Sequence, residues 1–171
     1  MKAKITLVTT AVAVLAAVSI SAAVAGPSNG SRASVGVSRS TFGRILVDGR
    51  GHSLYIFAMD RGRMSTCHGA CAANWPPLIS SGKARVRVGA KRSLIGRTRR
   101  IDGRWQVTYK GHPLYTFVKD TAKGETNGEG LIAFGAEWDL VSPGGARIGS
   151  DTPSDNGGGS TPPGGYGGYG P

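Results

Sequence analysis

The residues of this 171-residue chain that could carry out chemistry gather in one short stretch. Cys67 and Cys71 are its only cysteines, and Met59, Met64 and His68 lie within the same thirteen residues. Soft sulfur together with imidazole suits copper, which makes a metal-handling or redox accessory protein one interpretation of this stretch. A cysteine-ligated metal needs both sulfurs reduced, whereas an even cysteine count in an exported chain favours a disulfide. We therefore predict a structural Cys67–Cys71 disulfide and no bound metal, with the metal site as the alternative.

Other cysteine chemistry fits this spacing less well. Haem attachment needs Cys-x-x-Cys-His, but three residues separate these cysteines and Ala72 follows the second one. A redox dithiol needs Cys-x-x-Cys in a βαβ setting, and a catalytic cysteine needs a free thiol with an orienting acid. No nucleophile, base and orienting group occur together along the chain. The sequence predicts a non-catalytic protein without a cofactor.

Two aspartates with candidate roles belong to an internal repeat. Residues 51–60 and 111–120 share the pattern Gly-His-x-Leu-Tyr-x-Phe-x-x-Asp, with six of ten positions identical at an offset of 60. Tyrosine and phenylalanine two positions apart point to the same face of a strand, and the aspartate falls just after it. There the carboxylate can accept backbone N–H bonds and hold the following loop. The alternative is that the two aspartates converge on a cation or act in acid–base chemistry. The motif residues are Tyr55, Phe57, Asp60, Tyr115, Phe117 and Asp120.

The chain is strongly basic, with 21 Lys and Arg against 10 Asp and Glu and a formal net charge of +11. Nine of the basic residues lie between Lys83 and Arg104. A basic stretch of this kind favours polyanionic partners, which for an exported protein include anionic envelope polymers rather than a specific nucleic acid. A solvated surface without a partner is the alternative. Residues two positions apart on a strand face the same side, so basic residues at this spacing could form one positive surface. The candidate anion-binding residues are Lys83, Arg85, Arg87, Arg97 and Arg99.

The elements that must position these residues are short and β-rich. Residues 44–47 and 52–57 flank a glycine-rich turn, and residues 94–101 and 104–109 flank Asp102-Gly103, a strong hairpin signal. A further turn at 110–113 leads into residues 114–118. No stretch shows a sustained helical period. We predict an all-β fold, a small antiparallel domain built from two related repeats, with a short helical turn near the cysteines that stops before Pro76.

The two ends of the chain differ from this domain. Lys2 and Lys4, an apolar run and Ala23-Val24-Ala25 are typical of a cleavable signal peptide over residues 1–25. Residues 26–34 then form a flexible lead-in, residues 35–148 the two-repeat domain, and residues 149–171 a disordered Gly/Pro/Tyr-rich tail. Within the domain we place repeat 1 at about 40–78 and repeat 2 at about 94–142. No transmembrane segment is expected after signal cleavage, and the oligomeric state is not predicted.

The repeat also resembles a known bacterial family, the secreted repeats of unknown function, often described as predicted lipoproteins with a Tyr-x-aromatic-x-x-Asp motif. The resemblance extends to Cys67-x-x-x-Cys71 followed by Trp75-Pro76-Pro77-Leu78, to residues 106–115 and to the glycine loop 124–130. It covers about residues 40–142 and implies an exported envelope protein. The lipidation cysteine of such lipoproteins is missing here, so the resemblance does not imply a lipid anchor. We expect a secreted, non-catalytic envelope protein that binds anionic partners or has a structural role.

Overall fold

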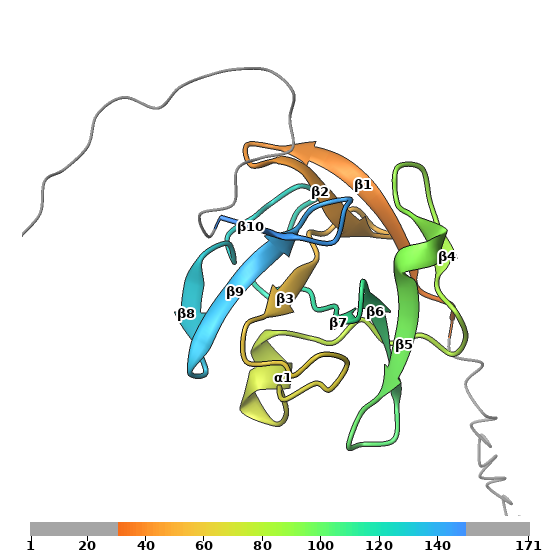
Figure 1. The fold of residues 1–171 in the computed structure, drawn as a ribbon. Coiled ribbons are helices and arrows are strands. Elements are labelled where there is room, and N and C mark those ends of the chain that lie inside the picture. The colour runs from red at the N-terminus through yellow and green to blue at the C-terminus, as the bar shows by residue number, and fades with distance from the viewer. Residues whose placement is uncertain (1–30, 150–171) are drawn as a thin grey trace, which may run out of the picture.

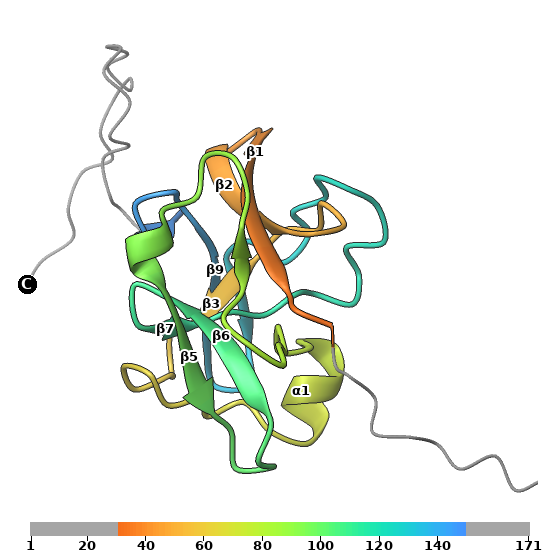
Figure 2. The same ribbon diagram turned by 90° about the vertical axis from the view of Figure 1, so that its right-hand side faces the viewer.

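The computed structural model describes residues 31–149, which form short strands around a common interior (Figures 1 and 2). The predicted signal peptide lies outside the described residues, as do most of the lead-in and all of the tail beyond Gly149. The described part of the chain contains ten strands, the short helix α1 (Ala70–Asn74) and a 3-10 turn at Arg92–Leu94. The strands are β1 (Ser34–Ser40), β2 (Gly43–Asp48), β3 (Tyr55–Phe57), β4 (Arg85–Val86), β5 (Ile95–Arg99), β6 (Trp105–Tyr109), β7 (His112–Pro113), β8 (Leu131–Ala133), β9 (Ala136–Val141) and β10 (Arg147–Ile148).

Three small sheets make up the domain, with strand orders β2-β1-β4, β10-β9-β3 and β5-β6-β7 and with β8 paired to β9. All pairs are antiparallel except β1 with β4. The two repeats build equivalent hairpins, β1–β2 and β5–β6. Gly43 and Gly103 stand at matching turn positions with φ of 89° and 78°, values that glycine adopts without steric cost. The fold is the predicted all-β domain of two repeats with a helical turn beside the cysteines. Within residues 31–149, no helix is long and apolar enough to cross a membrane.

The two strands predicted on either side of the 48–51 turn pair with different strands in the structure. The strands on either side of the 48–51 turn share only the bridge between Val47 and Ser53. The ladder partner of β2 is β1, and that of β3 is β9 near the end of the second repeat. Repeat 1 therefore contributes its motif strand to a sheet formed mainly by repeat 2.

Residues 114–118 of repeat 2 are equivalent to the β3 region of repeat 1 and were predicted as a strand. Only Tyr115 pairs, through isolated bridges to Tyr55 and Pro77. The segment opposite it contains Pro76 and Pro77, which have no N–H to donate to a ladder. Single bonds still hold the two segments together, from the Thr116 N–H to the Pro76 carbonyl and from the Leu78 N–H to the Leu114 carbonyl, both at 2.9 Å. The two halves thus have the same layout, with a regular ladder in only one of them.

The interior consists of two clusters of apolar side chains, and the motif strand β3 supplies both. Tyr55 and Phe57 face one cluster with the cysteines, the buried tryptophans and the second motif. Leu54 and Ile56 face the other cluster, beside β5 and β6. This alternation follows from the period of two of an extended strand.

Candidate functional site

The two copies of the repeated motif meet at the centre of the domain. The N–H of Tyr55 donates to the carbonyl of Tyr115 at 2.9 Å, and the N–H of Tyr115 donates back at 3.0 Å. The side chains are exchanged in the same way. The Tyr55 hydroxyl donates to Asp120 Oδ2 at 2.6 Å, and the Tyr115 hydroxyl donates to Asp60 Oδ2 at 2.8 Å. Each tyrosine therefore bonds the aspartate of the other repeat, across a pseudo-twofold axis.

Each aspartate also holds the loop that follows it. Asp60 Oδ1 accepts the backbone N–H of Thr66 at 2.7 Å, and Asp120 Oδ1 accepts that of Asn127 at 2.9 Å. Burial raises the pKa of both carboxyl groups, and these hydrogen bonds oppose the rise. The two carboxylates are bonded to different tyrosines and different loops. This arrangement corresponds to the structural interpretation of the motif, and among residues 31–149 no three His, Cys, Asp or Glu side chains gather as a metal site.

Aromatic rings of each repeat also stack on rings of the other repeat. Trp75 and Trp138 are stacked with ring centres 3.9 Å apart and planes 2° from parallel. Phe117 stacks on the outer face of Trp75 at 4.1 Å, and Phe57 stacks on the outer face of Trp138 at 4.2 Å. A stack of four rings thus alternates between the repeats. Such aromatic pairs contribute about 0.5–1.5 kcal/mol each beyond the area they bury.

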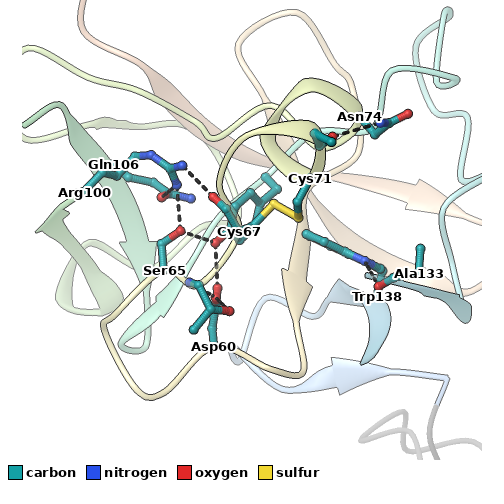
Figure 3. The surroundings of a disulfide bond; sticks show 12 residues. Asp60, Ser65, Cys67, Cys71, Asn74, Arg100, Gln106, Ala133 and Trp138 are labelled. Atoms are coloured by element: carbon teal, nitrogen blue, oxygen red, sulfur yellow. Dashed lines mark hydrogen bonds between the residues drawn. A yellow bond between two sulfur atoms is a disulfide. The ribbon is translucent and has the colours of Figure 1, made fainter. Parts of the chain in front are cut away.

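Cys67 and Cys71 form a disulfide beside this stack, with Cα atoms 5.3 Å apart (Figure 3). Cys67 is fully buried, and its carbonyl accepts a hydrogen bond of 2.6 Å from Arg100 Nη2. Because both sulfurs are bonded to each other, neither is a thiolate ligand or a nucleophile. Met59, Met64 and His68, the other members of the alternative metal site, are exposed on the surface.

Arg100 is a buried site residue that was not predicted from the sequence. Its side chain is 1% exposed although it belongs to the basic stretch. Besides Cys67, its guanidinium donates to Ser65 Oγ and Gln106 Oε1, both at 2.7 Å (Figure 3). The phenol hydrogen of Tyr115 goes to Asp60, so the Ser65 hydroxyl, 2.8 Å away, donates to the phenol oxygen. A chain of hydrogen bonds thus connects the buried guanidinium of Arg100 to the half-buried carboxylate of Asp60. The signal in the sequence was the pair Arg99-Arg100, because adjacent residues on a strand cannot face the same side.

The other basic candidates lie on the surface. Lys83, Arg85 and Arg87 are exposed, while Ala84 between them is buried and Val86 is partly buried. The alternation expected for a strand is therefore present at β4, and it points the three cations away from the interior.

The remaining two candidates, Arg97 and Arg99, lie on β5. Arg99 is exposed, whereas Arg97 is partly covered, with its guanidinium 4.7 Å from the centre of the Trp105 ring. A cation over an aromatic face is attracted by the ring quadrupole. Arg97 Nη1 also lies 3.5 Å from the carbonyl of Ser81, two residues before Lys83. This contact places Arg97, but not Arg99, beside the chain segment that leads into β4.

The chain is similar in sequence to one family of known proteins. Two of its segments, residues 36–79 and 96–142, match a family described as a secreted repeat of unknown function, and together they cover more than half of the chain. The chain belongs to this family. It is accordingly a secreted protein with two copies of the repeat. No curated protein and no solved structure matches it.

The two matched copies correspond to the exchange seen in the structure. Each contains one Tyr-x-Phe-x-x-Asp motif and one of the two stacked tryptophans. Segment 80–95, which carries Lys83, Arg85 and Arg87, lies between the matched copies. The matched segments therefore contain the residues of the buried junction, whereas Lys83, Arg85 and Arg87 lie outside them.

Proposed function

We propose that this secreted repeat protein is a non-catalytic binding module of the cell envelope, which holds anionic polymers on its basic surface. The observation that carries the proposal is the arrangement at β4. Lys83, Arg85 and Arg87 alternate with inward-facing residues, and all three side chains are exposed. A row of like charges on one side of a short strand is an electrostatic cost unless a partner of opposite sign neutralises it.

The pairing of charges within residues 31–149 supports this proposal. The ion pairs there use His52, Arg100, Arg104 and Arg147. None of them includes Lys83, Arg85, Arg87 or Arg99, all of which are exposed. These positive charges are available to an external polyanion, and polymers with repeated negative groups are the partners that a secreted protein meets at an envelope.

The motif residues support a binding role over a catalytic one. The hydroxyl groups of Tyr55 and Tyr115 are bonded to the carboxylates of Asp120 and Asp60, and burial raises the pKa of both phenols. The Asp60 and Asp120 carboxylates are bonded to loops and tyrosines. Their hydrogen-bonding capacity is used to join the two repeats, which leaves the surface as the place for function.

The test is retention on an anionic polymer as a function of salt. We expect the wild-type protein to bind immobilised polyphosphate at low ionic strength and to elute as salt rises, because each contact releases condensed counterions. Reversing Lys83, Arg85 and Arg87 to glutamate should abolish retention. The matched control reverses three exposed cations elsewhere, Arg61, Arg63 and Lys119, and should keep most of it.

Melting temperatures of the two triple variants check that the fold is intact, since surface changes usually cost less than about 0.5 kcal/mol. A wild-type protein that passes through the column at low salt would contradict the proposal. An equal loss of retention in both triple variants would show that binding depends on net charge and not on the position of the three cations.

A further inference from the structure

A groove on the surface gathers cations from four separate segments of the chain. Its volume is about 810 Å³, within the range of ligand sites of roughly 300–1,000 Å³. The cations that line it are Arg39 on β1, Arg50 in the turn after β2, Arg87 after β4, and Lys123 in the loop before β8. The first two belong to repeat 1, the last to repeat 2, and Arg87 to the segment between them.

Glycines next to the groove provide space for two of the long side chains. The stem of Arg87 lies over Gly36, where an added methyl group would be 3.1 Å from Arg87 Cβ. The stem of Lys123 lies over Gly51 in the same way, with a corresponding distance of 3.1 Å to Lys123 Cγ. Arg87 is further fixed by a hydrogen bond of 2.8 Å from Nη1 to the Gly49 carbonyl. Side chains held along their stems lose less entropy when a ligand binds their head groups.

The walls of the groove are tied together across the repeats. The Gly124 N–H donates to the Gly51 carbonyl at 3.1 Å, and the Ser53 hydroxyl donates to the Glu125 carbonyl at 2.5 Å. Glu125 in turn accepts the Ala122 N–H at 3.0 Å, which shapes the loop that carries Lys123. The chain segments that carry Arg50 and Lys123 are therefore held together before any ligand arrives.

The charge of the groove is almost entirely of one sign. Asp48 is the one acidic residue among those that line it, and its Oδ1 is turned into its own loop, where it accepts the N–H groups of Arg50 and His52 at 2.8 and 3.0 Å. None of the four cations forms an ion pair within residues 31–149. On β1 and β2, Arg39 even stands directly opposite Arg44, a like-charge pair that destabilises the hairpin in the absence of an anion.

We infer that this groove is the binding site for a linear polymer that carries an oxyanion on successive units, with Arg39, Arg50, Arg87 and Lys123 as the contacts. The inference rests on the proposed function and assigns it a place. The guanidinium groups present forked donors that match phosphate or carboxylate oxygens. An open groove lined from four segments accommodates a polymer chain that passes along it, with an anionic group at each cation.

The experiment measures binding of two fluorescently labelled polymers, polyphosphate and polygalacturonate, by anisotropy over a range of salt concentrations. The two polymers distinguish phosphate from carboxylate as the source of the oxyanion. The variant is Arg50→Ala with Lys123→Ala, which removes two groove cations and leaves Lys83, Arg85 and Arg87 in place. Its control, Arg61→Ala with Arg63→Ala, removes the same charge from exposed positions that do not line the groove.

We expect the groove variant to bind about tenfold more weakly at low salt, and the slope of log K against log salt to fall by about 1.5 for two lost contacts. The control should stay within about twofold of the wild type. If the groove variant behaves like its control while the wild type binds, the groove assignment is wrong and the proposed function stands. If the wild type binds neither polymer, both the proposed function and the assignment fail.

Discussion

The loops after the two motif aspartates have the same task and are held by different means. In both, the aspartate accepts a backbone N–H six or seven residues later, from Thr66 in one repeat and Asn127 in the other. The loop of repeat 1 is fastened by the disulfide and by the buried guanidinium of Arg100. The loop of repeat 2 instead packs Gly128 against Trp75 and Tyr55, so closely that a methyl group there would be 2.7 Å from the indole.

This difference separates what the motif requires from what each copy can vary. The exchange of tyrosines and aspartates involves both repeats at once, so neither copy can lose it alone. The support behind each loop also comes from the other repeat, but through residues that are not equivalent. At the position of Arg100, repeat 1 has Ser40, whose hydroxyl bonds only within its own turn, to the Gly43 carbonyl and the Phe42 N–H at 3.1 Å each. A duplicated fold therefore keeps its junction symmetric while its loops diverge.

The largest effect on stability is expected when the guanidinium of Arg100, which holds the loop of repeat 1, is removed. Arg100→Met should lower the free energy of unfolding by about 3 kcal/mol, because it leaves the buried acceptors on Cys67, Ser65 and Gln106 without a donor. Chemical denaturation measures this. Arg99→Met, at the exposed neighbour, is the control and should change stability by less than about 0.5 kcal/mol. Equal effects at the two positions would contradict the buried role of Arg100.

The second prediction tests whether Asp60 and Asp120 stabilise the two repeats equally. Asp60→Ala and Asp120→Ala should each cost about 1.5–3 kcal/mol, since each removes a charge-assisted acceptor. Double-mutant cycles then test the exchange directly. Tyr55→Phe should couple to Asp120→Asn by more than about 0.5 kcal/mol, and should be additive with Asp60→Asn within that margin. Coupling of Tyr55 to the aspartate of its own repeat would refute the crossed arrangement.

The smallest effect belongs to repeat 2 alone and depends on pH. Burial raises the pKa of Glu129 to about 7, and the nearby Asp139 and Glu137 add to the rise, while the Leu140 N–H and Arg147 oppose it. Because the folded protein holds this proton more tightly than the unfolded chain, the stabilisation is complete below about pH 4 and is lost as pH rises through 7. The partly exposed site limits the loss to about 1 kcal/mol.

Thermal melting at pH 5 and pH 8 measures this loss. Glu129→Gln should flatten the pH dependence, although the raised pKa values of Asp60, Asp120 and Asp139 leave a remainder of the same sign. Glu125→Gln is the matched control, because the N–H of Ala122 lowers the pKa of that exposed carboxyl group. A pH dependence unchanged in Glu129→Gln would assign the effect to other groups.

Much of the fold could be predicted from local patterns. The offset of 60 identified the repeat, Asp102-Gly103 marked the β5–β6 hairpin, and the alternation of Tyr55 and Phe57 with Leu54 and Ile56 assigned their two faces. The hairpin and the alternation depend on residues within a few positions of one another, and the repeat needs only a comparison of two segments of the sequence. The strand predicted at 114–118 was wrong in its length, because the deciding prolines lie about 40 positions away in the partner segment.

The sequence by itself determined that this protein has two similar units, a pair of cysteines able to bond, a surface of positive charge and membership of a secreted repeat family. Only the tertiary structure decided which repeat each side chain serves. The partners in the exchange, Tyr55 with Asp120 and Tyr115 with Asp60, are separated by 65 and 55 positions, and their contact depends on how the repeats are packed. The burial of Arg100 and the gathering of Arg39, Arg50, Arg87 and Lys123 in one groove have the same origin. Charge is a property of a residue, whereas its neighbours are a property of the fold.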